Sequence, residues 1–322
     1  MNNQLLNHAR VVKKDEFYTQ YDTIEKEMKY HFDAFRNKTI MCNCDDPVKS
    51  NFSKYFLKNF NQLHLKRLIV TGMALEPAQR GMLLDISRVP KQLSQDFFQR
   101  NVKQLGGNGD YASKEVINYM KQADIVVTNP PFSKFRSYLA TLIKYDKKFL
   151  IIGNVNAITY KEVFPLIQHN QLWLGASIHS GDREFRVPDD YPLKATGSRI
   201  DKNGVKYIRV KGVRWFTNLD YKQRHEDLIL YKHYLPNEYP KYDNYNGINV
   251  DKTADIPMDF NGAMGVPITF LDKYSPEQFK LIKFRKGDDN KDLRYTIDGA
   301  TKQPYFRIII KNKIRPPTPA MF

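Results

Sequence analysis

The chain has only two cysteines, Cys42 and Cys44, among its 322 residues. Two residues apart on an extended strand, their side chains would share one face but be badly placed for a disulfide. A zinc site needs more ligands close by, and the surrounding sequence offers none. We therefore expect no metal site and two free thiols, as is usual in the reducing cytoplasm.

Long apolar runs are also missing from the sequence. No stretch approaches the length of a membrane-spanning helix, so we expect no membrane association. The first fifteen residues, Met1 to Asp15, are polar and lack the apolar segment of a secretory signal peptide. These absences favour a cytoplasmic protein.

Acidic residues are scarce relative to basic ones. There are 35 Asp and Glu against 51 Lys and Arg, which gives a net charge of +16. An excess of this size says nothing about fold, but it favours a polyanionic partner, and nucleic acid is the commonest. Hydrophobic residues make up 41% of the chain, which is enough for a large core and excludes a disordered composition.

Short apolar runs alternate with helical patterns through the first two-thirds of the chain. This alternation predicts an α/β fold, with a mostly parallel Rossmann-like sheet covered by helices on both faces. Ligands bind such sheets at the carboxyl ends of the strands, so we expect the chemistry there. The clearest predicted strands are residues 39–44, 68–72, 124–128 and 149–153.

The pattern changes after about Asp220, where Tyr, Asn, Pro and Lys become frequent and the alternation ends. We predict a first domain over residues 1–220 and a smaller α+β region over residues 221–322. That region is rich in Lys and Arg, and the polar segment Gly181 to Gly204 reads as a long loop. Long loops within compact domains are usually functional, so both this loop and residues 221–322 are candidates for binding the polyanion and for recognising its target sequence.

The most specific pattern is Asn129-Pro130-Pro131-Phe132, directly after the predicted strand 124–128. Two prolines fix the backbone rigidly, which would hold the Asn129 side chain and the Pro130 carbonyl still. These two acceptors could bind both N–H groups of an amino group on a planar ring, while Phe132 stacks on the ring. The alternative is a turn that merely ends a strand.

The segment DIVVTNPPF resembles the catalytic motif of the adenine-specific DNA methyltransferases. Other segments resemble the EcoRI-type modification methyltransferases over nearly the whole chain. They are KKDEFYTQYDTIEKEM, MCNCDDPVKSNF, KYDKKFLIIGNVNAITYKEVF, YPKYDNYNGINV and GAMGVPITFLDKYSPEQFKLIKFRKG. The resemblance implies S-adenosylmethionine as cofactor, and Asn129, Pro130, Pro131 and Phe132 as the catalytic residues that bind the target base.

The resemblance also implies which residues hold the cofactor. Tyr18 and Thr19 match an N-terminal motif that contacts its methionine end, and Asp110-Tyr111 matches the acid and aromatic that hold its adenine. The segment after the first strand would also meet the cofactor. It consists of Asn43, Cys44, Asp45 and Asp46.

One feature departs from the wider group of such enzymes, which have a glycine-rich turn after the first strand. Here the turn is CNCDDPVKSNF, as in the EcoRI type, and it leaves open which of Cys44, Asp45 and Asp46 touches the cofactor. The acid for the ribose hydroxyls is also open, with Glu76 the nearest candidate.

These inferences predict a site-specific DNA adenine-N6 methyltransferase that flips its target base out of the duplex. We expect a monomer that binds double-stranded DNA, with a cognate restriction endonuclease as its functional partner. Two alternatives remain open. One is a methyltransferase that acts on an RNA base or a protein glutamine, and the other is a DNA-binding protein without catalysis.

Overall fold

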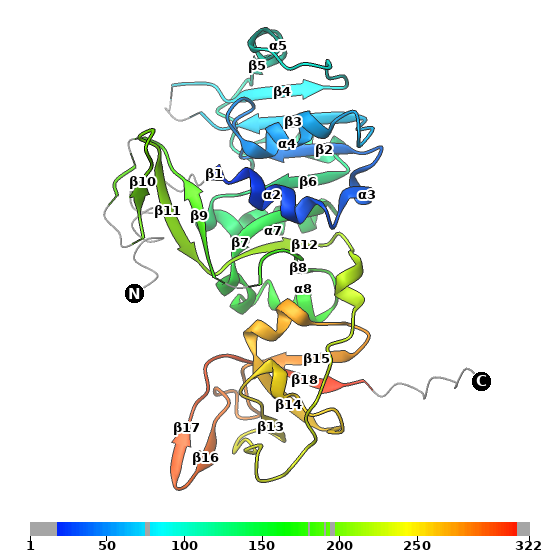
Figure 1. Cartoon of the computed structure of the whole chain (residues 1–322), viewed down its shortest axis with the longest axis vertical. Helices are drawn as coiled ribbons and strands as arrows, with labels where there is room; N and C mark the ends of the chain where they lie inside the picture. Colours follow the sequence, from blue (N-terminus) through cyan, green and yellow to red (C-terminus); the bar gives the residue numbers. More distant parts are fainter. Residues whose placement is uncertain (1–17, 75–77, 180, 190, 194–196, 314–322) are drawn as a thin grey trace, which may run out of the picture. The chain divides into compact units, whose positions relative to one another are not determined.

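The computed structural model describes residues 18–74, 78–179, 181–189, 191–193 and 197–313. Within these residues the chain divides into two compact units (Figure 1). The first comprises the described residues of Met1–Ile158 and Leu174–Asp220, and the second those of Thr159–Trp173 and Tyr221–Phe322. The second unit thus includes a short segment that precedes residue 220.

A mixed sheet forms the centre of the first unit. Its strands are β2 (Thr39–Asn43), β3 (Arg67–Gly72), β4 (Met82–Ile86), β5 (Val102–Gln104), β6 (Ile125–Thr128), β7 (Lys148–Asn154), β8 (Trp173–Leu174) and β12 (Val213–Thr217). Their order is β5-β4-β3-β2-β6-β7-β12-β8. The central strands β3, β2, β6 and β7 are parallel, whereas β4, β5 and β12 pair antiparallel. The predicted Rossmann-like sheet is confirmed, and its antiparallel flanks are an addition to the prediction.

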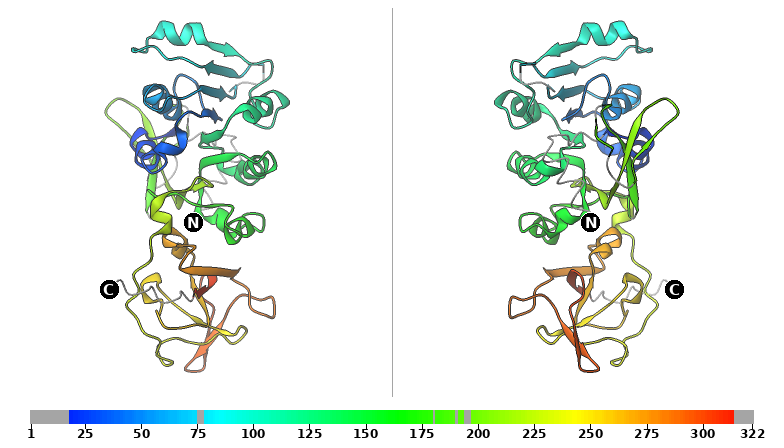
Figure 2. Two further views of the ribbon diagram at one scale, coloured as in Figure 1. Left: turned by 90° about the vertical axis from the view of Figure 1, so that its right-hand side faces the viewer. Right: turned by 90° about the vertical axis from the view of Figure 1, so that its left-hand side faces the viewer.

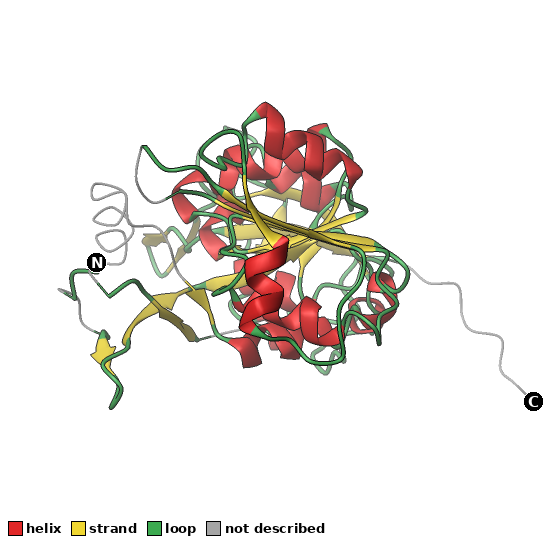
Figure 3. Ribbon diagram, turned by 90° about the horizontal axis from the view of Figure 1, so that it is seen from above, coloured by secondary structure: helices red, strands yellow, loops and turns green. Residues whose placement is uncertain are grey.

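Helices cover both faces of this sheet (Figures 2 and 3). On one face lie α2 (Tyr21–Met28), α3 (Phe32–Phe35) and α4 (Asn51–Asn59), and on the other α6 (Lys114–Gln122) and α7 (Phe135–Lys144). A further helix, α5 (Gln95–Asn101), contacts β4. All four residues of β6 are buried, as expected for a strand with helices on both sides.

One large hydrophobic core lies between α4 and the sheet. Phe52 and Phe56 of α4 pack in one cluster with Cys42 of β2, Val127 of β6 and Trp215 of β12. The ring of Phe52 stands edge-on to Trp215, with centroids 6.0 Å apart. This burial fixes α4, and therefore the loop that precedes it, against the carboxyl end of β2.

The order of the strands reverses between β2 and β6. From β2 the chain continues to β3 on one side, whereas β6 continues to β7 on the other. In open α/β sheets such a reversal leaves a crevice at the carboxyl ends of the two strands, where ligands bind. Here those ends are Asn43 and Thr128.

A small sheet lies beside the central one, formed by β1 (Tyr18–Thr19), β9 (Asp182–Arg186), β10 (Arg199–Ile200) and β11 (Lys206–Lys211), in the order β1-β9-β11-β10 (Figure 1). The prediction of a loop over Gly181 to Gly204 is therefore wrong where β9 and β10 form. Alternate residues of the ribbon point inward, and Phe185, Ile208 and Val210 are buried. This period-two alternation is the signal that the polar composition obscured.

The second unit contains a sheet of order β13-β14-β18-β15 and a hairpin, β16-β17. Its elements are α8 (Phe164–Gln168), β13 (Gly247–Asn249), β14 (Ala263–Pro267), β15 (Phe279–Phe284), β16 (Tyr295–Ile297), β17 (Ala300–Lys302), β18 (Arg307–Asn312) and the 3₁₀ helices η3 (Lys222–His225), η4 (Thr253–Asp255) and η5 (Ile268–Lys273). The predicted C-terminal strands are thus present, around a small core that includes Tyr242, Tyr295 and Ile309.

Cys42 is buried and Cys44 half-buried, and both are free thiols. Among the described residues, no group of His, Cys, Asp and Glu is arranged to hold a metal ion. None of the helices that these residues form has the length and apolarity needed to cross a bilayer.

Candidate active site

Asn43 ends β2 at the crevice and is fully buried. Its side-chain Oδ1 accepts a hydrogen bond from the Tyr138 hydroxyl of α7. Its Nδ2 is buried and has no hydrogen-bond partner among the described residues. Thr71 of β3 pairs with Asn43 in the sheet, and its hydroxyl is likewise buried without such a partner. Two polar groups on neighbouring strands are therefore left for a ligand, and Thr71 is one that the sequence did not suggest.

Asp45 lies just past β2 and is buried. The Ser50 hydroxyl lies 2.6 Å from its Oδ1, and the Thr128 hydroxyl lies 2.6 Å from its Oδ2. Burial raises the pKa of Asp45 to about 7, because the charged form loses its hydration. The two hydroxyls oppose this shift, and the negative charge of Asp46 adds to it.

The turn after β2 is formed without glycine. Cys44 has a φ of 66°, in the left-handed region that glycine normally occupies. Asp46 holds the next residues, since its Oδ1 accepts from the backbone N–H groups of Val48 and Lys49 at 2.8 and 2.9 Å. Ser50 then caps α4 by accepting from the N–H of Phe52. The turn therefore contains a left-handed residue that is not glycine, and side-chain hydrogen bonds from Asp46 and Ser50 hold its conformation.

The short strand β1 brings Tyr18 and Thr19 to the same edge. β1 pairs with β9, and the Thr19 carbonyl accepts from Asn51 Nδ2 at 2.8 Å. Since Asn51 begins α4, β1 lies beside the start of that helix. The Thr19 hydroxyl is buried and has no hydrogen-bond partner within the described residues.

The loop that carries Asp110 and Tyr111 is packed tightly against the ends of β3 and β4. A Cβ atom on Gly109 would lie 2.4 Å from the Gly72 carbonyl oxygen, and one on Gly81 would lie 2.6 Å from the Gly109 Cα. Gly109 also has a φ of 81°. Close backbone approach therefore fixes where Asp110 stands.

Two side-chain contacts join this loop to the segment after β6. Asp110 Oδ2 lies 3.3 Å from the Nζ of Lys134, and the Tyr111 hydroxyl lies 2.8 Å from the Ser137 hydroxyl. The Tyr111 ring meets Tyr138 edge-on, with centroids 5.0 Å apart. Sequence reasoning missed Lys134, Ser137 and Tyr138. Ser137 and Tyr138 follow Lys134 by three and four residues, which places the three side chains on one side of the first turn of α7.

The segment Asn129 to Phe132 leaves the buried end of β6 at the crevice. Asn129 is half-buried and Pro130 is buried. Phe132 begins the 3₁₀ turn η1 (Phe132–Lys134) and is half-buried, with its ring edge-on to Phe185 of β9 at 6.3 Å. The structure thus brings the predicted residues after β2, before α6 and after β6 to one edge of the sheet. Glu76 lies outside the described residues.

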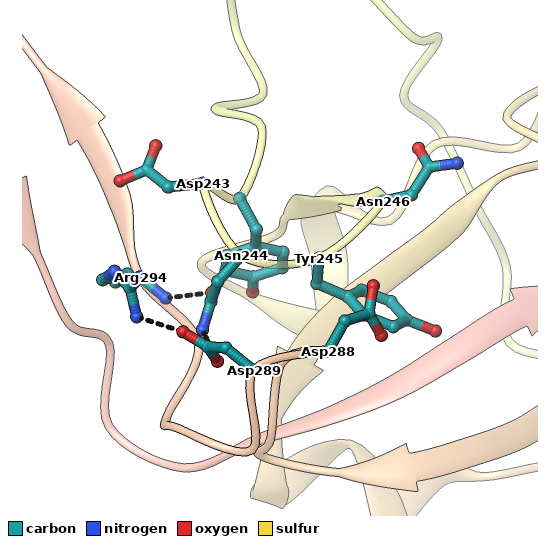
Figure 4. Close-up of a pocket in the computed structure, with 8 residues that line it drawn as sticks. Asp243, Asn244, Tyr245, Asn246, Asp288, Asp289 and Arg294 are labelled. Atoms are coloured by element: carbon teal, nitrogen blue, oxygen red, sulfur yellow. Dashed lines mark hydrogen bonds and ion pairs between the residues drawn. The ribbon is translucent and has the colours of Figure 1, made fainter.

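Several basic residues of the second unit form ion pairs with its own carboxylates. Arg285 and Lys286 both pair with Asp292, Lys283 with Asp288, and Arg307 with Asp251. The same kind of pairing occurs in a pocket of about 460 Å³ in this unit. Arg294 donates to Asp289 at 2.9 Å, and the Asn244 amide donates to the same carboxylate (Figure 4). This pocket is lined by Tyr242, Asp243, Asn244, Tyr245, Asn246, Asp288, Asp289 and Arg294.

The outer face of the β9–β11 ribbon differs from this. Arg199 pairs with Glu184 at 2.6 Å, but no ion pair among the described residues involves Arg186 or Arg209, and both are exposed. The register places Arg209 opposite Glu184 and Arg186 opposite Tyr207, on the face away from the buried Phe185. Arginine side chains are therefore available on this face, in the same unit as Asn129.

Comparison with known proteins supports the methyltransferase prediction. The family model for the adenine-specific methyltransferase EcoRI matches residues 5–313. The chain is 53% identical over 322 residues to the type II methyltransferase M.EcoRI of Escherichia coli, with 97% of each chain covered. It is 41% identical to M.MgeORF184P of Mycoplasma genitalium and 38% identical to M.MpnI of Mycoplasma pneumoniae, both also type II methyltransferases. Each of these two matches covers 86% of this chain and 84% of the relative.

Proposed function

The chain belongs to the EcoRI family of adenine-specific methyltransferases, and from this we propose that it transfers a methyl group from S-adenosylmethionine to the N6 amino group of an adenine in DNA. The observation that carries the proposal is the position of Asn129-Pro130-Pro131-Phe132 at the carboxyl end of β6, where the strand order reverses. A motif suited to binding a ring amino group thus stands where a ligand crevice is expected.

The residues at this edge fit S-adenosylmethionine. The buried polar atoms Asn43 Nδ2 and Thr71 Oγ1 are available to a ligand with hydroxyl, carboxylate and amino groups. Asp110 would accept from the cofactor's adenine amino group, and Tyr111 would pack on its ring. Thr19 would meet the methionine end. When bound, the cofactor supplies a methyl group on a positively charged sulfur.

The target amino group is held by acceptors of this chain. The Asn129 side-chain oxygen and the Pro130 carbonyl each accept one N–H, which draws the nitrogen lone pair out of conjugation and orients it for bond formation. Phe132 stacks on the base, and its contact with Phe185 keeps the ring in place. With the cofactor bound, the amino nitrogen would accept the methyl group as the sulfur leaves as a neutral thioether, and it would lose one proton to water.

The adenine reaches this site by flipping out of the duplex, which costs a few kcal/mol and requires compensating contacts to the DNA backbone. The net charge of +16 supports such contacts. We expect a monomer, because each strand of a site needs one transfer. It would act in the cytoplasm with the DNA that it marks, beside a restriction endonuclease of the same specificity.

A transfer assay tests the proposal. The protein is incubated with tritiated S-adenosylmethionine and duplex DNA from several sources, and the DNA is digested to nucleosides. We expect label in N6-methyldeoxyadenosine. Label in RNA or protein substrates and none in any DNA would overturn the DNA assignment and favour one of the other methyltransferase classes.

We expect the outer face of the β9–β11 ribbon to contact DNA phosphates. Arg186→Ala and Arg209→Ala should each lower the slope of log K against log salt concentration by about 1, with a loss of affinity that is similar for all sequences. The measurement is a salt titration of binding to a short duplex by fluorescence anisotropy. Lys66→Ala is the matched control, because Lys66 is exposed but precedes β3 at the amino edge of the sheet. A slope unchanged in both arginine variants would rule out this surface.

We also expect Lys134 to orient Asp110 for the cofactor. Both side chains are partly exposed, so the pair contributes roughly 0.2–1 kcal/mol. Lys134→Met should therefore weaken S-adenosylmethionine binding up to about fivefold, as measured by equilibrium dialysis. Lys144→Met, at the C-terminal end of α7, serves as control, and equal affinities in the two variants would exclude the role.

A further inference from the structure

The hydroxyl of Thr128 makes two contacts that a single proton cannot serve. It lies within hydrogen-bond distance of the Asn43 carbonyl oxygen and, at 2.6 Å, of Asp45 Oδ2. A hydroxyl has one proton to donate, and a carbonyl oxygen can only accept. With its proton directed at the Asn43 carbonyl, the Thr128 hydroxyl can only accept from Asp45, and a protonated carboxyl group would supply that second hydrogen bond.

The surroundings of Asp45 favour the same protonation state. The groups that face it are Cys42 on β2, Tyr138 on α7 and Asp46 on its own loop, and each is either neutral or acidic. Burial raises the pKa values of the Cys42 thiol and the Tyr138 hydroxyl as well, so neither supplies a charge. Among the described residues, no cation acts on the carboxyl group, whose pKa lies at about 7.

We propose that Asp45 works as a neutral carboxyl group that positions the target-base motif against the cofactor loop. Its proton is donated to Thr128, the residue directly before Asn129, and its Oδ1 accepts from Ser50, which caps α4. The inference rests on the proposed function. It makes Asp45 a positioning residue that acts through Thr128, with both of its oxygens occupied by protein hydroxyls.

A neutral carboxyl group and a carboxamide offer the same pattern at these two positions. In Asp45→Asn, Oδ1 can accept from Ser50 and Nδ2 can donate to Thr128. In Asp45→Leu, both hydroxyls lose this partner, although the side chain keeps the same branching. We expect Asp45→Asn to keep kcat within about threefold of the wild type. Asp45→Leu and Thr128→Val should lower kcat about tenfold, with a smaller change in KM for S-adenosylmethionine.

A second readout needs no methyl transfer. Because the folded-state pKa of Asp45 is raised, the native protein holds this proton between about pH 4 and pH 7, where the unfolded chain has lost it. Its contribution to stability is therefore full below about pH 4 and is lost as pH rises towards 7. Urea unfolding at about pH 5 and about pH 8 should show Asp45→Asn gaining stability relative to the wild type at the higher pH.

The two readouts separate the possible outcomes. Asp45→Asn as impaired as Asp45→Leu, or a stability difference between wild type and Asp45→Asn that does not change with pH, would overturn the inference. Should Asp45→Leu fail to fold, the Asn variant and the unfolding data still decide. If the wild-type protein methylates no DNA, the proposed function fails, while the unfolding measurement continues to report on the proton of Asp45.

Discussion

Asn129→Ala is expected to lower kcat for methyl transfer to DNA on the order of a thousandfold. The substitution removes one of the two acceptors that hold the adenine amino group, and losing one preorganised hydrogen-bonding group at a reacting centre costs about 10²–10³ in rate. Cofactor affinity should change little, because Asn129 is proposed to contact the base. The measurement is single-turnover transfer of tritiated methyl to duplex DNA, together with equilibrium dialysis of the cofactor.

The matched control for this prediction is Asn61→Ala. Asn61 is exposed in the turn after α4, so the same change of residue type there should leave transfer unaffected. Folding of both variants is compared by thermal unfolding. A rate for Asn129→Ala within tenfold of the wild type, at equal stability, would show that the amino group is held by other residues.

Gly109→Ala is expected to lower the free energy of unfolding by roughly 2–5 kcal/mol and to weaken S-adenosylmethionine binding more than tenfold. The φ of 81° is unfavourable for alanine, and the new Cβ would lie 2.4 Å from the Gly72 carbonyl oxygen. The backbone of Gly72 cannot move away without shifting the end of β3, so the loop with Asp110 and Tyr111 must shift instead. Urea unfolding and equilibrium dialysis measure the two effects.

Gly204→Ala separates the two causes. Gly204 has a similar φ of 79°, in the hairpin before β11, but a Cβ there would meet no atom within 4 Å. Only the conformational cost applies, about 1 kcal/mol, and cofactor affinity should be unchanged. If the two glycine variants lose the same stability and bind the cofactor equally, the close approach to Gly72 does not position the loop.

The candidate site could be located from sequence because its residues follow strands with strong local signals. Ile125 to Thr128 is a β-branched run that predicts a buried strand, and the residues after it therefore lie at a carboxyl edge. The same argument applies to Asn43, the last residue of β2. Thr71, Lys134 and Tyr138 were missed because nothing local distinguishes them, and only the packing of α7 and β3 brings them near Asn43 and Asp110.

The β9–β11 ribbon and the C-terminal arginines show more clearly what could not be predicted from the sequence. Polar residues in Gly181 to Gly204 suggested a loop, but pairing with β1 and β11 lets Phe185 reach the core, and such pairing depends on distant residues. Similarly, the charge count indicated a basic C-terminal region, whereas the structure pairs Arg285, Arg294 and Arg307 with acids of the same unit.

The sequence by itself determined the α/β class, the parallel centre of the sheet, the family and the motif at its edge. These follow from periodicity and short contiguous segments, in which the relevant residues are neighbours along the chain. Only the tertiary structure decided which basic side chains remain free of ion pairs and which buried polar atoms lack a protein hydrogen-bond partner. It also decided which hydroxyl is the hydrogen-bond partner of the Asp45 carboxyl group. Those properties arise from groups such as Asp45 and Thr128, 83 positions apart, whose contact exists only when the strands lie side by side.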